Sequence, residues 1–566
     1  MRATHVLSVA AVTLLLVLWY PRSGDVAAVN SPAALAGAVH SREEGPMEGV
    51  LVTARADGAK FSVTVASDER GRYSVPARVL QPGHYTISTR AVGYDQVTAG
   101  RIDVAGEKEA KLDLTLQKTK DLSSQLTTLE WMMSVPGTPD QKDELARQTV
   151  NCGFCHTLER VVKSRYTADQ WDAVIRRMST YFPDGTGLRR HQKYAEREGG
   201  PLPMSEGQVA RTRKLAEYLA SINLSGGRKT WDYELKTLPR PKGLATRAII
   251  TEYDLPKQDS VPHDLDVDSK GTVWYGDAGW NFIGKLDPRS ATFTEYPVPG
   301  FMPGNPLGVL DVAVDTQDNL WPAYALQGQK IAKFDTKTEK MTFWDLPNPQ
   351  KYGNGIAVAF MMPSHNDADG KVWMTDLGTA IRLTPATGQI EVFNVFDKVG
   401  GRQGHMIYQI SADSKNNCYF MDAAGANIGR IDAKTRDVKF YPVPTPKSYP
   451  RRGAMDAQDR LWFGEFLADK IGMFDTKTER FQEWVVPFKY IAPYYAAADR
   501  NGDVWVSGNQ ADRLLRLNPK TGKIVDYLLP RYSDSRRLAV DTSTDRVTIW
   551  LPNKNNASII RVEALQ

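Results

Sequence analysis

The stretch "VPHDLDVDSKGTVWYGDAGWNFIGKLDP" at residues 261–288 contains the pattern that decides the fold, because the pattern returns along the rest of the chain. Each copy has a strand ending in Asp, a turn, an aromatic strand, a strand like "IGKLD" and a strand ending in Pro. The aromatic anchors of the copies are Trp274, Trp321, Trp373, Tyr419, Trp462, Trp505 and Trp550. These anchors lie about 43–52 residues apart, and four-stranded repeats of roughly this length are typical of propeller blades. We therefore predict a seven-bladed β-propeller over residues 247–566.

The two ends of this region predict how the ring closes. The segment "ITEYDLP" at residues 250–256 looks like a closing strand, yet it precedes the first copy. The last copy stops at "IIRVEALQ" and lacks such a strand. A closed ring leaves no strand edge open to aggregation. We therefore expect the early strand to complete the last blade.

The copies at residues 261–288, 457–475 and 500–519 resemble the virginiamycin B (streptogramin) lyase family. The resemblance implies a carbon–oxygen lyase that opens an ester-linked ring by elimination, using histidines, a glutamate, a tyrosine and Mg²⁺ around the central channel. It also implies that the functional residues stand five positions before each strand-ending Asp. In this chain those positions hold His263, Leu310, Tyr408, Arg451, Tyr494 and Arg536.

This set departs from the family pattern. The late blades carry Arg451, Tyr494 and Arg536 where the family has Pro-His pairs, and no carboxylate precedes Pro262-His263. Two guanidiniums disfavour a Mg²⁺ ion at the same channel mouth, which argues against streptogramin cleavage. Arginine forks match carboxylate and phosphate geometry, so we expect an anionic or oxygen-rich small-molecule ligand in the channel. The alternative is a wet channel whose residues only pair with nearby acids.

Residues 34–117 predict a small all-β domain. Short alternating runs are separated by turn residues, as in "SDERGRYSV" at 67–75 and "LQPGHYTISTRAVGY" at 80–94. The segment resembles the carboxypeptidase regulatory-like domain, a β-sandwich related to the transthyretin fold. The resemblance implies an adhesive or structural role.

Residues 118–228 have a helical pattern and contain "CGFCH" at 152–156. The C-x-x-C-H spacing predicts covalent attachment of one haem c through Cys152 and Cys155, with His156 as the iron ligand. A zinc site or a thioredoxin-like pair is the alternative. Residues 125–224 resemble class I cytochrome c, which implies Met204 as second axial ligand. Met178, His191 or an open position are the rivals.

The N-terminus predicts export. Arg2 is followed by an apolar run from Val6 to Tyr20 and then by small residues at Ala27 and Ala28. This order is typical of a signal peptide, here residues 1–28, which is removed from the mature protein. An uncleaved anchor is the alternative. We expect a periplasmic protein with no transmembrane segment in the mature chain.

Charge excludes one class of partner. The chain has 71 basic and 66 acidic residues with no basic stripe, so nucleic acid is not expected. The combined prediction is a multidomain, mainly β chain with a β-sandwich, an α-helical cytochrome c domain, a linker at 225–246 and the propeller. We hypothesise periplasmic electron transfer with a redox partner, coupled to binding or oxidation of a substrate. A lyase-like enzyme and a non-enzymatic scaffold that docks a redox partner are the alternatives.

Overall fold

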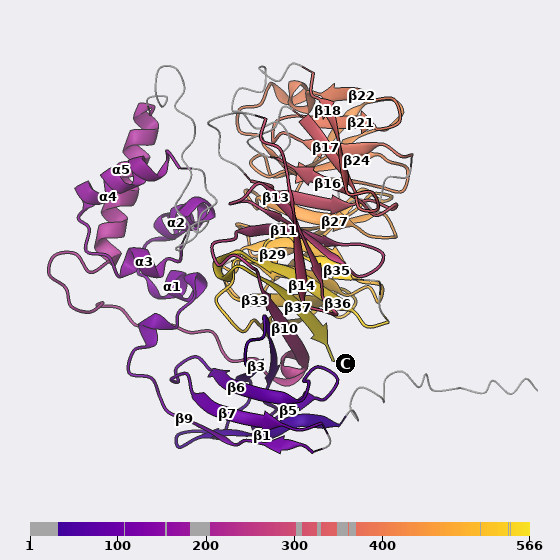
Figure 1. The fold of residues 1–566 in the computed structure, drawn as a ribbon. Coiled ribbons are helices and arrows are strands. Elements are labelled where there is room, and N and C mark those ends of the chain that lie inside the picture. The colour runs from indigo at the N-terminus through magenta and orange to yellow at the C-terminus, as the bar shows by residue number, and fades with distance from the viewer. Residues whose placement is uncertain are drawn as a thin grey trace, which may run out of the picture.

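A computed structural model describes residues 32–106, 108–152, 156–181, 204–301, 308–324, 330–347, 360–361, 369–509, 511–541, 543 and 545–565. The predicted signal peptide, Cys155 and His191 lie outside these ranges. The chain is mainly β, with a propeller-like C-terminal region, a sandwich at one side of it and a helical segment at another (Figure 1).

Within the described residues, the propeller-like region shows seven four-stranded antiparallel units. The first unit contains β11 (Pro262–Val267), β12 (Val273–Asp277), β13 (Phe282–Asp287) and β14 (Thr292–Pro297), and the second contains β15 (Asp311–Val314), β16 (Asn319–Ala323), β17 (Lys330–Asp335) and β18 (Lys340–Asp345). The third contains β19 (Phe360–Met361), β20 (Val372–Thr375), β21 (Ala380–Thr384) and β22 (Gln389–Phe393). The fourth contains β23 (Ile407–Ala412), β24 (Cys418–Asp422), β25 (Asn427–Ile431) and β26 (Val438–Pro442). The other three are β27 (Pro450–Met455), β28 (Arg460–Glu465), β29 (Lys470–Asp475) and β30 (Arg480–Val485); β31 (Pro493–Ala498), β32 (Val504–Gly508), β33 (Arg513–Asn518) and β34 (Lys523–Leu528); and β35 (Ala539–Asp541), β36 (Thr548–Asn553) and β37 (Ser558–Ala564) with β10 (Ala248–Asp254).

A hydrogen-bonded Asp–Trp pair explains the repeated pattern of the blades. Asp268 follows the innermost strand of the first blade, accepts backbone N–H groups of the turn and accepts the indole N–H of Trp274 at 3.0 Å. The same indole bond joins Asp456 to Trp462 at 2.8 Å. The same bond lies within the second, sixth and seventh blades, whereas the indole of Trp373 donates to Asn416 of the next blade and the fourth blade has Tyr419 in place of a tryptophan. In five blades the buried indole is thus satisfied within its own blade.

Ring closure occurs as predicted, and the sandwich extends it. Strand β10 pairs with β37 over its whole length, from Ala248↔Ala564 to Asp254↔Ser558. Its other edge pairs with sandwich strand β4 (Phe61–Ala66), so that one eight-stranded sheet runs from β35 to β7 (Thr98–Val104). The closing strand therefore has no free edge.

The sandwich has two sheets around one apolar core that includes Ile249 of β10. The sheet shared with the propeller contains β3 (Leu51–Ala56), β4, β6 (Gly83–Arg90) and β7. The other contains β1 (Ala33–Ser41), β2 (Gly45–Pro46), β5 (Arg72–Pro76), β8 (Ala110–Lys111) and β9 (Leu114–Leu116). Arg90 fixes the sandwich to the sixth blade, donating to Asp512 at 2.5 Å and to the carbonyl of Leu529 at 2.6 Å.

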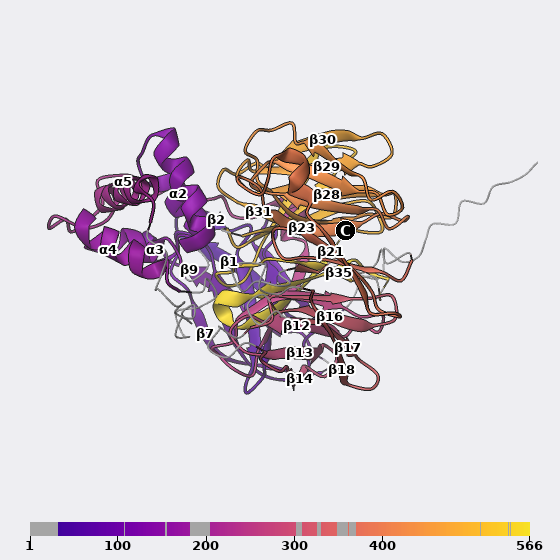
Figure 2. The ribbon, with the colours of Figure 1, turned by 90° about the horizontal axis from the view of Figure 1, so that it is seen from above.

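The described part of the chain has five α-helices, all between the sandwich and the propeller in sequence. They are α1 (Thr128–Ser134), α2 (Pro139–Cys152), α3 (Glu159–Val162), α4 (Ala168–Met178) and α5 (Glu206–Ile222). Capping boxes start α4 at Thr167 and α5 at Ser205. The helices lie on one side of the propeller in both views (Figures 1 and 2).

The predicted α-helical cytochrome c domain over residues 125–224 is not seen, and this part of the fold prediction was wrong. The interior of the helical segment is filled by its own side chains, led by Trp131, whose ring centroid lies 5.0 Å from that of Trp231. Tyr490 of the propeller packs against the same cluster. The structure instead shows a mainly β chain in which short helices form an apolar pad against the propeller.

Among the residues that the structure describes, no helix combines the length and apolar character needed to cross a bilayer.

Candidate functional site

The six predicted channel positions lie where the innermost strands begin, and we call these residues the ring. They are His263, Leu310, Tyr408, Arg451, Tyr494 and Arg536. All six side chains are buried. Two groups of direct contacts join five of them: Arg536 with His263, and Arg451 with Tyr408 and Tyr494. Leu310 contributes an apolar wall.

Irregular pairing lets two consecutive residues of a strand reach the channel. The ladder between β27 and β28 shifts register between Pro450 and Gly453, and that between β31 and β32 shifts between Pro493 and Ala496. The ladders of β11 and β23 shift near their starts in the same way. Such bulges re-aim side chains that would otherwise alternate between faces. In these four blades the bulge lies at or beside the ring residue and the residue that follows it.

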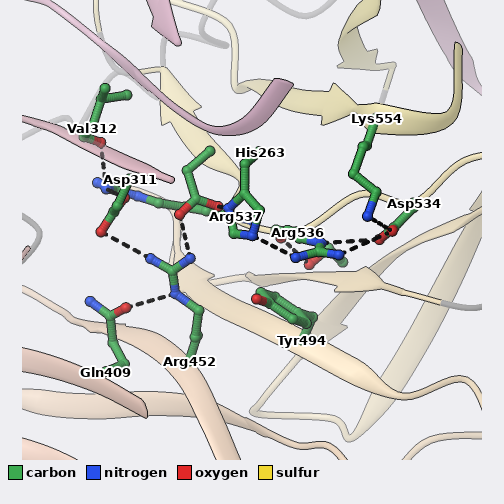
Figure 3. Close-up of polar contacts among 12 residues, drawn as sticks. His263, Asp311, Val312, Gln409, Arg452, Tyr494, Asp534, Arg536, Arg537 and Lys554 are labelled. Atoms are coloured by element: carbon green, nitrogen blue, oxygen red, sulfur yellow. Dashed lines mark hydrogen bonds and ion pairs between the residues drawn. The ribbon is translucent and has the colours of Figure 1, made fainter. Parts of the chain in front are cut away.

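These second residues form a network of buried charges, which we call the paired layer (Figure 3). Its members are Asp264, Asp311, Gln409, Arg452 and Arg537, which directly follow ring positions, together with Asp266 of the first blade. Arg452 contacts Asp264 at 2.5 Å and Asp311 at 3.2 Å, and it donates to Gln409 at 2.7 Å. Arg537 contacts Asp311 and Asp266, each at 2.8 Å. Opposite charges therefore compensate one another inside the channel.

Electrostatics of the paired layer favour the ionised forms. Burial alone would raise the pKa of Asp264, but Arg452 and His263 hold this pKa below its ordinary value. The carboxylates of Asp264 and Asp311 raise the pKa of Arg452, although burial alone would lower it. The layer is a structural plug of ion pairs rather than a set of free ligands.

His263 stands in a chain of polar contacts that fixes its tautomer. Arg536 donates from Nη1 to His263 Nε2 at 2.5 Å, because a guanidinium has donors only. The imidazole proton is therefore on Nδ1, which lies 3.1 Å from Asp264 Oδ1. On its far side Arg536 contacts Asp534 at 3.3 Å, and Asp534 also contacts the buried Lys554 at 3.2 Å. The imidazole positions Arg536 and has no nitrogen left to act as a base.

The second group of ring residues is aromatic. Arg451 donates from Nη2 to the hydroxyl of Tyr408 at 2.6 Å, and that hydroxyl lies 3.2 Å from the hydroxyl of Tyr494. Burial raises the pKa of Tyr494 well above its ordinary value, so its hydroxyl keeps its proton. Tyr449, two residues before Arg451 in the sequence, has a left-handed backbone (φ 58°), which is a costly conformation for a bulky residue.

The Mg²⁺ ion that the lyase resemblance implies does not fit the residues present. The ring offers one imidazole, whose Nε2 already faces a guanidinium, and the nearest carboxylates belong to the ion pairs of the paired layer. Within the described ranges no three His, Cys, Asp or Glu side chains gather in a metal-binding group. A hard cation would need several free oxygen ligands.

The haem c prediction is also corrected. The thioether of Met204 receives an N–H from Arg176 at 3.4 Å, and His156 Nδ1 lies 3.0 Å from the carbonyl of Thr157. In the part of the chain that is described, these residues form no metal-binding group. The side chain of Cys152 and all of Cys155 lie outside the described residues. Haem c and electron transfer have no support here.

Acidic residues recur after the aromatic strands of several blades, and all but one of them have a structural role in a turn. Asp277 accepts the backbone N–H groups of Val261, Gly279 and Trp280. Asp376 and Asp422 bind turn N–H groups in the same way. Glu465 differs, because neither carboxyl oxygen has a hydrogen-bond partner in the described structure. Burial, with the negative charge of Glu483 nearby, raises the pKa of Glu465 to about 8.

A cavity of about 270 Å³ lies between the helical segment and the fifth and sixth blades. Met132 and Asp143 line it from the helices, and Phe466, Tyr490 and Ala492 line it from the propeller. The ring of Phe466 also lies 4.3 Å from the guanidinium carbon of Arg451. One aromatic side chain therefore forms a wall of both the cavity and the ring.

Comparisons with known proteins agree with two of the three resemblances. Residues 242–458 match the model of the virginiamycin B lyase family, and residues 34–117 match the carboxypeptidase regulatory-like domain. Neither model covers the helical segment. A search of curated proteins found no match.

Two solved structures are similar to this chain at low identity. A structure described as "Streptogramin B lyase structure" is 23% identical, with a TM-score of 0.48 over 57% of this chain and 99% of its own. Virginiamycin B lyase from Staphylococcus aureus is 23% identical, with a TM-score of 0.48 over 56% of this chain and 99% of its own. Residues 242–458 of this chain are thus similar to the virginiamycin B lyase family, and its sandwich is similar to the carboxypeptidase regulatory-like domain.

Proposed function

We propose that the propeller is a carbon–oxygen lyase that breaks an ester by elimination at the ring. The family match over residues 242–458 supports the reaction class. The observation that carries the proposal is the hydroxyl pair of Tyr408 and Tyr494, 3.2 Å apart and held against Arg451. This arrangement places a proton acceptor, the phenolic oxygen of Tyr408, beside the fixed positive charge of Arg451, and it needs no metal ion.

The reaction has simple requirements. A base removes a proton from the carbon next to the one that bears the ester oxygen. The electrons of that C–H bond form a C=C bond, the C–O bond breaks, and the acyl part leaves as a carboxylate. No water is consumed. The site must accept a proton and stabilise negative charge that develops on oxygen.

The ring residues can be assigned to these steps. Tyr408 takes the proton on its phenolic oxygen, since Arg451 and the protonated Tyr494 both present donors to that oxygen. Arg536, positioned by His263 and Asp534, stabilises the leaving carboxylate. In the same step the hydroxyl proton of Tyr408 passes to the departing ester oxygen, so Tyr408 ends the cycle in the state in which it began.

The test uses the full chain with two probes in ¹⁸O-labelled water. One probe is quinupristin, which the virginiamycin B lyase of Staphylococcus aureus binds in one solved structure. The other is a linear O-acyl-threonine peptide whose acyl group carries a free carboxylate. We expect an unsaturated product from the second probe and unlabelled carboxylate, with no response to added Mg²⁺.

Two variants assign the base. Tyr408→Phe should lower the rate by about 100-fold or more. Tyr441→Phe is the matched control, because Tyr441 lies on the outer strand of the same blade and its hydroxyl binds Glu479 at 2.6 Å. Labelled carboxylate would indicate hydrolysis. That result, an equal effect of both variants, or no turnover of either probe would refute the proposed function.

A further inference from the structure

The guanidinium of Arg451 is buried without a counter-charge. Its side chain is about 1% exposed, and its only described hydrogen bond goes to the neutral hydroxyl of Tyr408. Nε and Nη1 have no partner within the described part of the chain. A buried charge left unpaired costs several kcal/mol. A fold gains nothing from such a group unless something else compensates it.

Four aromatic rings enclose this guanidinium, and we call them the Arg451 cage. The guanidinium carbon lies 4.1 Å from the ring centroid of Tyr408, 4.3 Å from that of Phe466, 4.8 Å from that of Tyr494 and 5.6 Å from that of Tyr449. The rings stabilise the cation through their faces. They exclude water and leave the unpaired N–H groups as the polar part of the cage.

The neighbouring residue shows how the same channel treats an arginine with a structural role. Arg452 is fully buried, and every part of its fork meets Asp264, Asp311 or Gln409. Carboxylates that neutralise a buried guanidinium are therefore present beside the residue that follows Arg451. Arg451 differs because its environment offers π faces and hydroxyls in place of carboxylates.

We propose that the Arg451 cage is the binding subsite for a single carboxylate of the substrate. This deepens the proposed function, on which the choice of reaction rests, by naming the charge of the molecule that is cleaved. The two unpaired nitrogens present N–H donors to carboxylate oxygens. The rings of Phe466 and Tyr494 contact the apolar or flat part that carries the carboxylate.

The charge of the cage favours a monoanion over a phosphate. One uncompensated guanidinium supplies one positive charge, and the other ring guanidinium, Arg536, is already in contact with Asp534. A phosphate monoester carries about −1.5 to −2 at neutral pH, so it would bring excess negative charge into an aromatic site. A planar carboxylate also fits the fork of the guanidinium.

Binding without turnover tests this inference separately from the reaction. Benzoate has a carboxylate and a flat apolar body but no ester, so it can bind whether or not the chain is a lyase. Titration calorimetry on the full chain compares benzoate with benzamide, its neutral analogue, and with phenyl phosphate. We expect saturable binding of benzoate, and at least tenfold weaker binding of the other two.

Variants locate the site. Arg451→Met and Arg451→Gln should each weaken benzoate binding at least tenfold, with folding checked by circular dichroism, while Tyr441→Phe keeps it. The inference would be overturned if the natural chain does not bind benzoate, if both Arg451 variants bind benzoate as tightly as the natural chain, or if phenyl phosphate binds more tightly than benzoate. Benzoate binding that depends on Arg451, in a chain that cleaves neither ester probe, would refute only the proposed reaction.

Discussion

The paired layer and the Arg451 cage hold consecutive arginines in opposite electrostatic conditions. Arg452 meets two carboxylates and an amide, whereas Arg451 meets one neutral hydroxyl and four aromatic rings. Both side chains are buried, and both come from the first residues of β27. The backbone bulge between Pro450 and Gly453 separates their surroundings. Position alone therefore does not decide what a buried arginine does.

The difference teaches how a propeller can combine a stable centre with a reactive one. A compensated network fixes the inner strands relative to one another, because removing one member leaves another charge unpaired. An uncompensated cation is a poor stabiliser but a strong attractor for an anion. Each layer should respond to mutation in its own way.

The largest effect is expected from Asp311→Ala, which breaks the paired layer. Asp311 contacts both Arg452 and Arg537, so its loss leaves two buried cations undercompensated. The free energy of unfolding, measured with urea, should fall by about 3–5 kcal/mol. Asp345→Ala is the control, since Asp345 forms an exposed pair with Lys330 in the same blade. Equal losses would show that the channel pairs contribute nothing special.

A pH series on Glu465→Gln comes next. The pKa of Glu465 is raised to about 8, so the folded chain holds this proton between about pH 4.5 and 8 while the unfolded chain does not. The natural chain loses this contribution progressively as pH rises from 5 to about 8, by at most roughly 4 kcal/mol, and no further above the raised pKa. The glutamine variant should therefore gain in relative stability from pH 5 to 9. Parallel curves would contradict the raised pKa.

Arg451→Met should have a smaller effect of the opposite sign to Asp311→Ala. Removing an uncompensated buried cation relieves its desolvation, and methionine fills a similar volume among the aromatic rings. We expect the ligand-free chain to gain about 1–3 kcal/mol of unfolding free energy. Arg452→Met is the matched comparison and should be destabilising. A similar loss in both variants would remove the distinction between the layers.

The smallest change in the free energy of unfolding is expected from an exposed ion pair, which serves as the reference for the buried pairs. Arg72 and Asp68 form an exposed ion pair at 2.9 Å in the sandwich, far from the channel. Arg72→Ala should change the free energy of unfolding by less than about 1 kcal/mol. The shift should shrink further in 1 M salt, because exposed pairs are screened. A loss as large as that of Asp311→Ala would mean that burial does not govern the comparison.

Much of the architecture could be predicted because it is encoded locally. The repeat reflects the Asp–Trp bond that five of the blades make within themselves, as between Asp456 and Trp462. The closing role of residues 250–256 followed from a strand missing at the C-terminus. The capping boxes at Thr167 and Ser205 need only residues three positions apart.

Features that join distant segments could not be predicted in the same way. The ring positions were found by their offset from each strand-ending Asp, but their pairing was not. The paired layer was missed, although its signal is simple in retrospect: Asp264, Asp311, Gln409, Arg452 and Arg537 each directly follow a ring position. Charges contributed by different blades share a network only after the ring has closed.

In the helical segment the error was the reverse: a cofactor domain was predicted that the structure does not show. A five-residue motif and a general helical pattern predicted a cofactor domain, whereas the described interior is packed by Trp131, Trp231 and a propeller tyrosine, Tyr490. A short motif says little about what fills a core. The helical pattern also overstates the apolar face of α5, since Val209 is 38% exposed.

The shared sheet has a consequence for the order of events during synthesis. Strand β10 leaves the ribosome long before β37, its partner in the last blade, yet β4 has already been made. Because N-terminal domains fold first on a growing chain, the sandwich can hold one edge of β10 while the six preceding blades assemble. The small domain thus chaperones, within one polypeptide, the strand on which circular closure waits.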